Sequence, residues 1–374
     1  MSKRTRNERL HVFYFIHDLA PFGAQHTILH TVRRRDKERL RVTVCSFWGE
    51  ESLAAELASH DVEVVCLRAK RFFDPLAWLK LLFLLLREYP RVIVTTLPEL
   101  GVPARVASLL LPRMAVVQVF QNPLSSEPPF WAYLNKMTLW LCDAVVFTSR
   151  GNVDGVVAQR PGIKDRTIVI QNSVTLADVP AGDGAALRRE LGLTDGENLI
   201  GCVGRLTPQK GHDVLIAAAA ELRKENVPVV LLFAGDGELQ PELKAHARDK
   251  GIEKHVLFLG RRTDVARILA SLDIYAAPSR WESFNIALGE AMASRRACVG
   301  TSIPGHADIL EDKVTGLAVP ADDPQALKDA IAWLLGHPKE GQRFAAAARE
   351  RVLTHFTPEI MAMKYNKLFF SLAE

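Results

Sequence analysis

Two basic residues that follow an apolar run form the first group that could do chemistry. Residues 204–211 read GRLTPQKG and come directly after Leu199–Val203, whose composition is that of a buried strand. Arg205 can bind phosphate oxygens in pairs, and Lys210 adds a compact positive charge. The segment is not a P-loop, because that loop requires GxxxxGK[ST] and here Gly211 follows the lysine. The pair predicts a site for a phosphate-bearing ligand. The alternative is a solvated turn with two surface cations.

Two glutamates form the second group. Residues 279–292 read SRWESFNIALGEAM. Ser283 is a typical N-cap residue and predicts a helix that runs from there to about Ser294. Glu282 then lies just before the helix, and Glu290 lies about 12 Å further along its axis.

The start of this predicted helix is a second potential anion site. The N–H groups of Phe284 and Asn285 would be free, and the positive end of the helix dipole would point the same way. Glu290 has apolar neighbours, so its carboxylate would need polar partners, and sugar hydroxyls would serve. The alternative is an ordinary capped helix with a surface glutamate.

Two glycine turns could let the backbone approach a ligand. Gly235-Asp236-Gly237 follows the apolar run Val229–Ala234, and Gly23 opens a helical segment after the first strand. Such turns are common without any ligand, so a simple tight turn is the alternative for each.

Several kinds of site have no signature in the chain. There is no DxD, HExxH or clustered His and Cys, so no metal site is predicted, and no GxSxG nucleophile elbow is present. The five cysteines are scattered, which favours reduced and mostly buried thiols over a disulfide framework.

The elements that must position these residues alternate between strand and helix. Buried apolar runs separated by helical patterns are typical of parallel sheets covered on both faces. The predicted strands of the first half are 11–16, 42–47, 62–67, 92–96, 116–120, 144–148 and 167–170, with helices at 25–34, 51–59, 74–87 and 131–142. After a pause at 172–198, strands are predicted at 199–203, 229–234, 256–259, 274–277 and 297–301.

This pattern predicts two doubly wound α/β domains, 1–175 and 176–356. The last segment, 357–374, is expected to form a helix that packs back on the first domain. Open α/β sheets bind ligands beyond the carboxyl ends of their strands, so the site is expected in a cleft between two facing domains.

Taken together, the motifs resemble the family 4 glycosyltransferases, which have the GT-B fold of two Rossmann-like domains facing across a cleft. GRLTPQKG is similar to that family's G-R-[LF]-x-x-x-K-G, and Glu282 to Glu290 is similar to its E-x7-E. The resemblance covers about residues 165–335, and the N-terminal half matches only loosely.

The resemblance implies a role for each motif residue. Arg205 and Lys210, next to Gly204, would neutralise the donor diphosphate, and Glu282 would contact the donor sugar. Glu290 would hold the ribose hydroxyls.

Further donor contacts are implied from three other segments. The N–H groups of Phe284 and Asn285 would bind phosphate oxygens. Arg262 would lie beside the nucleobase, and Gly23 would approach the diphosphate from the other domain.

Two departures from the family pattern concern the donor-sugar pocket. Phe22 stands where the family has the first glycine of a pair, and Gln121 or Asn122 stands where it often has a histidine. Reduced activity or an unusual sugar would follow from an altered pocket.

The function implied is a retaining, metal-independent glycosyltransferase that uses a nucleotide-diphosphate-sugar and no cofactor. UDP is the favoured base because it is the commonest in the family, and the acceptor would be a glycan, a lipid-linked molecule or another hydroxyl. The alternatives are a catalytically degenerate sugar-nucleotide-binding protein and a GT-B sugar-nucleotide epimerase. No nucleic-acid partner is expected.

The distribution of charge and hydropathy indicates where in the cell the protein is expected. Residues 1–175 carry a formal charge of +7 and the remainder −3. No signal peptide or membrane span is predicted, so the expected place is the cytoplasm. The apolar helix 76–87, preceded by Arg68, Lys70 and Arg71, could lie on an anionic membrane. The alternative is a core helix packed on the first sheet.

Overall fold

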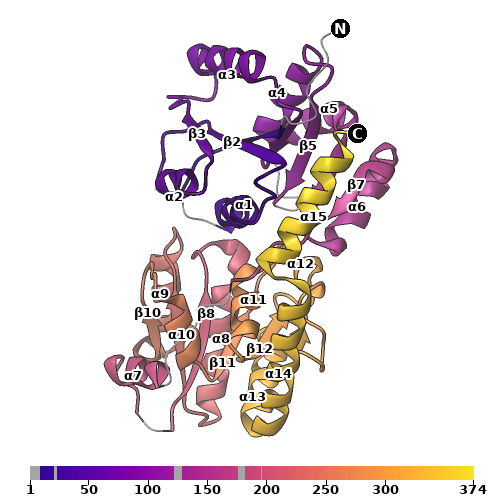
Figure 1. Ribbon diagram of the computed structural model, residues 1–374. Coiled ribbons are helices and arrows are strands. Elements are labelled where there is room, and N and C mark those ends of the chain that lie inside the picture. Colours follow the sequence, from indigo (N-terminus) through magenta and orange to yellow (C-terminus); the bar gives the residue numbers. More distant parts are fainter. Residues whose placement is uncertain (1–8, 21–22, 122–128, 176–181, 195) are drawn as a thin grey trace. The chain divides into compact units, whose positions relative to one another are not determined.

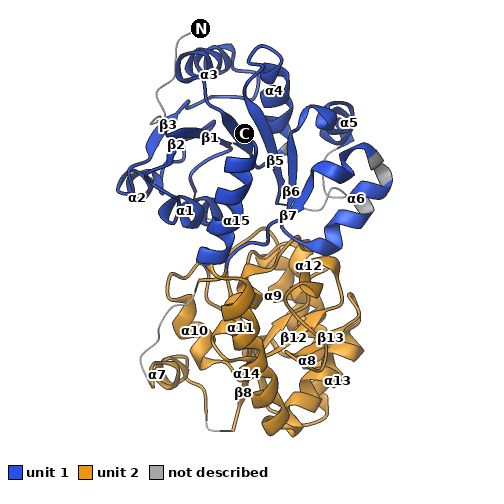
Figure 2. Cartoon of the chain, turned by 45° about the vertical axis from the view of Figure 1, so that its right-hand side comes forward, with its two compact units in different colours: residues 1–173, 358–374 blue, residues 174–357 orange. Residues whose placement is uncertain are grey.

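The computed structural model describes residues 9–20, 23–121, 129–175, 182–194 and 196–374. The chain divides into two compact units (Figure 2). Unit 1 comprises residues 1–173 and 358–374, and unit 2 comprises residues 174–357. The sequence-based boundaries were 175 and 356.

Unit 1 is built on a seven-stranded parallel sheet in the order β3-β2-β1-β4-β5-β6-β7 (Figure 1). Its strands are continuous apolar runs because helices cover both of its faces. Their bounds are β1 Leu10–Ile16, β2 Leu40–Ser46, β3 Glu63–Cys66, β4 Val92–Thr95, β5 Ala115–Phe120, β6 Ala144–Phe147 and β7 Thr167–Val169.

Helices cover the sheet of unit 1 in two layers. One face packs against α1 (Gly23–Arg33), α2 (Ala54–Ala58) and α15 (Pro358–Ser371). The other face packs against α3 (Pro75–Glu88), α4 (Pro98–Ser108) and α6 (Val153–Gln159), while α5 (Pro129–Thr138) packs on α4. The last helix of the chain thus shares a core with the first strands.

Unit 2 has a six-stranded parallel sheet in the order β10-β9-β8-β11-β12-β13. Its strands are β8 Asn198–Val203, β9 Val229–Ala234, β10 Val256–Phe258, β11 Ile274–Ala277, β12 Ala297–Thr301 and β13 Leu317–Val319. One face packs against α8 (His212–Lys224), α9 (Gln240–Asp249) and α13 (Pro324–Gly336). The other packs against α7 (Asp183–Glu190), α10 (Val265–Ser271), α11 (Ile286–Ala293) and α14 (Pro338–His355).

The element pattern read from the sequence is largely confirmed. Every predicted strand is present, with ends within two residues of those expected. Strand β13 and helices α4, α6 and α7 had no counterpart in the prediction, which gave bounds in unit 2 for the helix at 283–294 alone. The helix expected at 51–59 is reduced to α2. Among the described residues no helix is both long and apolar enough to cross a membrane.

Candidate functional site

The loops that carry the motif residues leave neighbouring strands of unit 2. Strands β8 and β11 pair in parallel, although β9 and β10 lie between them in the chain. The sheet continues from β8 to β9 and β10 on one side and from β11 to β12 and β13 on the other. Open α/β sheets bind ligands at such a reversal of strand order. Loops 204–211 and 278–285 both start there.

Arg280 links these two loops through hydrogen bonds. Its guanidinium donates two hydrogen bonds to Asp213, at 3.0 and 2.7 Å, and one to the carbonyl of Pro208, at 2.7 Å. Its backbone N–H donates to the carbonyl of Gln209 at 2.8 Å. Sequence reasoning missed this residue, because its partners lie about 70 positions away and a surface arginine has no distinctive spacing.

Lys210 and Glu282 meet between the two loops. The lysine Nζ lies 2.6 Å from Oε1 of Glu282, and both side chains are largely buried. The hydroxyl of Ser279 also donates to Oε1, at 3.1 Å, and the amide of Gln209 donates to Oε2, at 3.1 Å. A charge-assisted pair with further donors holds both side chains in fixed positions. Separate roles were expected for these two residues, and the structure brings them together.

Arg205 differs from Lys210 in its surroundings. Its side chain is exposed, and no hydrogen bond or ion pair engages its guanidinium within the described ranges. The loop under it is fixed, because Leu206 donates its N–H to the carbonyl of Asp236 at 2.8 Å. Gly204 lies against the side chain of Lys210, and a Cβ there would be 3.2 Å from the lysine Cε.

The helix after Glu282 begins later than the sequence predicted. Its N-cap is Asn285, not Ser283, and the Asn285 Oδ1 accepts a hydrogen bond from the N–H of Leu288 at 3.2 Å. Phe284 and Asn285 therefore precede the first turn of α11 instead of forming it. The Phe284 ring is buried against Phe356, with centroids 5.5 Å apart.

A buried histidine supports this N-cap. Since Oδ1 of Asn285 accepts, its Nδ2 is the amide donor to Nε2 of His306, at 3.0 Å. The His306 Nδ1 then carries the proton and donates to the carbonyl of Thr301, at 3.0 Å. Burial lowers the pKa of His306 to about 4, so the ring is neutral at pH 7. The sequence gave no signal for this histidine, which stands among eleven dispersed ones.

Glu290 lies in α11, about one and a half turns beyond the N-cap Asn285. Burial raises the pKa of its carboxyl from an ordinary 4.5 to about 7. Within the described ranges no hydrogen bond or ion pair satisfies that carboxyl. Such a group gains from ligand hydroxyls, which offer both donors and acceptors.

Arg262 and Gly23 belong to segments other than the two motif loops. Arg262 follows β10 at the sheet edge and forms two hydrogen bonds with Asp264, at 2.7 and 2.6 Å. Gly23 begins α1 in unit 1. The departures at Phe22 and Asn122 lie outside the described residues.

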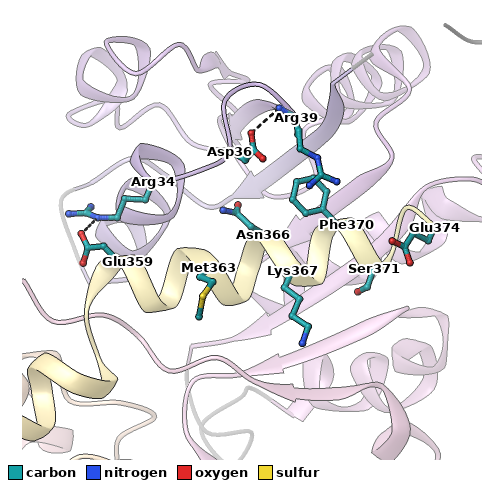
Figure 3. A pocket seen from close by; sticks show the side chains of 10 residues that line it. All are labelled: Arg34, Asp36, Arg39, Glu359, Met363, Asn366, Lys367, Phe370, Ser371 and Glu374. Atoms are coloured by element: carbon teal, nitrogen blue, oxygen red, sulfur yellow. Dashed lines mark hydrogen bonds and ion pairs between the residues drawn. The ribbon is translucent and has the colours of Figure 1, made fainter. Parts of the chain in front are cut away.

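A pocket on unit 1 contains none of the predicted site residues. It lies between the turn that follows α1, residues 34–39, and α15 with the residues after it, and three basic and three acidic side chains line it (Figure 3). Arg34 pairs with Glu359, and the guanidinium of Arg39 lies 3.8 Å from the centre of the Phe370 ring. Both arginines are thus engaged within unit 1, and the pocket's balanced charge does not favour an anion. In the part of the chain that the structure describes, no His, Cys, Asp and Glu cluster is placed to hold a metal ion.

Comparison with known proteins indicates a glycosyltransferase. The pattern that defines the family described as glycosyl transferases group 1 matches residues 183–351. A lipopolysaccharide core biosynthesis mannosyltransferase, LpcC of Rhizobium leguminosarum bv. viciae, is 32% identical over 247 residues, which are 63% of this chain and 67% of that one. A D-inositol 3-phosphate glycosyltransferase of Mycobacterium sp. (strain KMS) is 32% identical over 225 residues, which are 59% of this chain but only 51% of that protein.

Two solved structures share the fold. Anabaena Alr3699/HepE, crystallised with UDP and glucose, has a TM-score of 0.83 at 20% identity, over 97% of this chain and 100% of that one. The sucrose-phosphate synthase of Thermosynechococcus elongatus has a TM-score of 0.82 at 18% identity, over 97% and 99%. The two parallel-sheet units and these neighbours confirm the GT-B fold class.

Proposed function

Because the chain belongs to the group 1 glycosyl transferases, we propose that it is a retaining family 4 enzyme that uses a UDP-sugar donor. The E-x7-E motif of that family would be Glu282 to Glu290. The support for UDP is that HepE, which has the same fold, was crystallised with UDP and with UDP-glucose.

The observation that carries this proposal is the Lys210–Glu282 pair at the reversal of strand order, with Arg205 beside it. In our proposal the diphosphate lies against Arg205 and Lys210, and the donor sugar contacts Glu282. The lysine then shares its charge between a carboxylate and the phosphate. Because the pair is already in place before donor binds, little reorganisation is needed.

The barrier to transfer is departure of the nucleotide from an oxocarbenium-like sugar carbon. Negative charge grows on the β-phosphate as that bond breaks. Fixed positive charges aimed at this phosphate stabilise the transition state more than the ground state. Arg205 and Lys210 would supply this stabilisation without a metal ion. The acceptor hydroxyl attacks the same face that the phosphate leaves and gives its proton to the departing phosphate, which retains the anomeric configuration.

With the diphosphate placed in this way, we propose the following further contacts to the donor. Glu290 accepts hydrogen bonds from the ribose hydroxyls, and the N–H groups of Phe284 and Asn285 bind phosphate oxygens. Arg262 borders the base, and it would use the face of its guanidinium because Asp264 occupies the edge. Gly204 leaves room for the side chain of Lys210.

We propose as the acceptor a hydroxyl of a glycan, of a lipid-linked molecule or of another compound. The support is the family relationship to enzymes named for lipopolysaccharide core and inositol 3-phosphate substrates.

The donor is identified first. A thermal-shift panel of UDP, GDP, ADP and their sugar conjugates, with and without EDTA, tests base and metal together. A ligand at 100 times its Kd stabilises by about 2.7 kcal/mol. A selective UDP shift that EDTA leaves unchanged is the expected result. No shift with any nucleotide would refute the proposed donor site. Binding of a UDP-sugar without transfer or hydrolysis would favour the catalytically degenerate binding protein, and conversion of a UDP-sugar to its epimer without acceptor would favour the epimerase.

The variant Lys210→Ala then tests whether the positive charge of this lysine stabilises the departing phosphate. Turnover is expected to fall about 100-fold or more, because one donor to the developing phosphate charge is lost. Lys224→Ala, which removes an exposed lysine from α8, is the control and should leave turnover unchanged. Turnover of Lys210→Ala close to that of the control would refute this role.

A further inference from the structure

Unit 1 exposes an unusual number of large apolar side chains on one of its two helical layers. Among the described residues, twelve of the seventeen exposed large hydrophobic side chains lie between Phe73 and Trp140. Phe73 comes just before α3, and the others belong to α3, to the end of α4 and the turn after it, and to α5 with the turn after it. These elements form the layer on one face of the seven-stranded sheet (Figures 1 and 2).

Helix α3 is apolar on both of its sides. Ala77, Leu81, Leu84 and Leu85 are buried against the sheet. Leu76, Leu79, Phe83 and Leu86 recur at intervals of three and four residues on the opposite side and are 53–68% exposed. A soluble helix normally presents polar residues there. One stripe of this helix therefore belongs to the core, and within the described residues the other stripe is exposed.

Helix α5 and its following turn repeat the same spacing. Phe130, Tyr133, Met137 and Trp140 are 54–66% exposed. The end of α4, on which α5 packs, adds Val106, Leu109 and Leu110 at 51–67%. An exposed apolar patch built from three helical segments marks an interaction site.

The charges within this layer select the partner. In residues 70–87, 106–113 and 129–140 every exposed charged side chain is basic: Lys70, Arg71, Lys80, Arg87, Arg113 and Lys136. Asp74, the acidic residue that starts α3, is partly buried and caps the N–H groups of Leu76 and Ala77. Aromatic and leucine side chains with basic residues among them fit the headgroup region of an anionic bilayer. Contact with a second copy would place Lys80, Arg87 and Lys136 against the same basic residues.

We propose that this layer, the α3–α5 face, docks unit 1 on an anionic lipid surface. The apolar side chains enter the boundary between headgroups and acyl chains, and the basic residues contact the headgroups. Docking does not depend on the transferase activity proposed above, so each can fail alone.

Vesicle flotation of the full chain tests the proposal, with neutral phosphatidylcholine vesicles against vesicles that contain phosphatidylglycerol. The wild type is expected to float with anionic vesicles at low salt and to be released as salt rises. Leu79→Ser/Phe83→Ser/Trp140→Ser should reduce binding about tenfold or more, since the exposed apolar area is lost. Lys80→Gln/Lys136→Gln should reduce it on the order of 30-fold through the loss of two charges.

Met363→Ser is the matched control, because Met363 is 62% exposed on α15, on the other face of the same sheet. It should float like the wild type. All variants change exposed positions, and circular dichroism with a melting curve verifies their folding. Two results would overturn the proposal: wild type that does not float at low salt, or a triple serine variant that binds as well as wild type. A wild-type dimer that the triple variant abolishes, without vesicle binding, would also overturn it and assign the face to self-association.

Discussion

At the scale of single residues, the site combines side chains that are paired with side chains that are not. Lys210 and Glu282 satisfy each other, while Arg205 and Glu290 have no partner within the described ranges. The paired residues gain rigidity. Arg205 is solvated, whereas the buried Glu290 carboxyl carries a cost that a ligand can relieve.

Glu290 makes that cost measurable through pH. Its pKa is about 7 in the folded protein and near 4.5 when unfolded, so the folded state binds the extra proton between these values. The free energy of unfolding therefore falls as pH rises from about 4.5 to about 7, by roughly 2–3 kcal/mol. Glu290→Gln should match the wild type at pH 5 and melt at a higher temperature at pH 8.

Differential scanning calorimetry at the two pH values measures this effect. Glu242→Gln, which changes an exposed carboxylate at the start of α9, is the control and should show no such pH dependence. If Glu290→Gln gained nothing at pH 8, the carboxylate would have a partner after all.

At the scale of elements, Gly211 lets the two loops of the site pack closely, because it lies against Pro278. It has a φ of +63°, and a Cβ there would lie 2.1 Å from the carbonyl oxygen of Pro278. Gly192 has a φ of +72° with nothing near its Cβ position. Both positions carry the left-handed penalty for a side chain, of about 1–2 kcal/mol. Only Gly211 adds a clash.

The two glycines therefore form a matched pair for substitution by alanine. Gly192→Ala should lose about 1 kcal/mol of stability and no activity. Gly211→Ala should lose about 1–3 kcal/mol more, and its turnover should fall about tenfold or more as Lys210 and Glu282 move apart. Urea unfolding and a transfer assay measure both. Equal losses in the two variants would show that the loops relax around the clash.

Local features explain why some elements were not predicted from the sequence. Helix α4 contains Pro103 in its interior, and proline there normally breaks a helix pattern. Strand β13 has only three residues. The N-cap of α11 was placed at Ser283 because serine and asparagine cap equally well, and only the contact of Asn285 with His306 decides between them.

The sequence indicated Lys210 and Glu282 because each stands in a motif of fixed spacing, and the structure brings the two side chains into contact. Residues that act through distant partners were not, and Arg280 with Asp213 is the example. Long-range pairs leave no trace in one sequence.

At the scale of the whole molecule, the chain returns to unit 1 for its last helix. Phe369 of α15 is 2% exposed, and its ring centroid lies 6.2 Å from that of Tyr14 in β1. No residue of this core belongs to the two clusters of unit 2. The stability of unit 1 therefore depends on residues that come after all of unit 2 in the sequence.

Phe369→Ala should consequently destabilise one unit and spare the other. Loss of a buried phenylalanine costs about 3–5 kcal/mol, and this cost falls on the core that contains β1 and β2. Hydrogen exchange should speed up in residues 10–16 and 40–46 while 198–203 and 274–277 stay protected, and the UDP-induced thermal shift of unit 2 should remain. Met363→Ala, on the same helix but exposed, should change neither. If protection of 198–203 fell as far as that of 10–16, the two cores would unfold as one cooperative body, and the return of α15 would then stabilise the donor site as well.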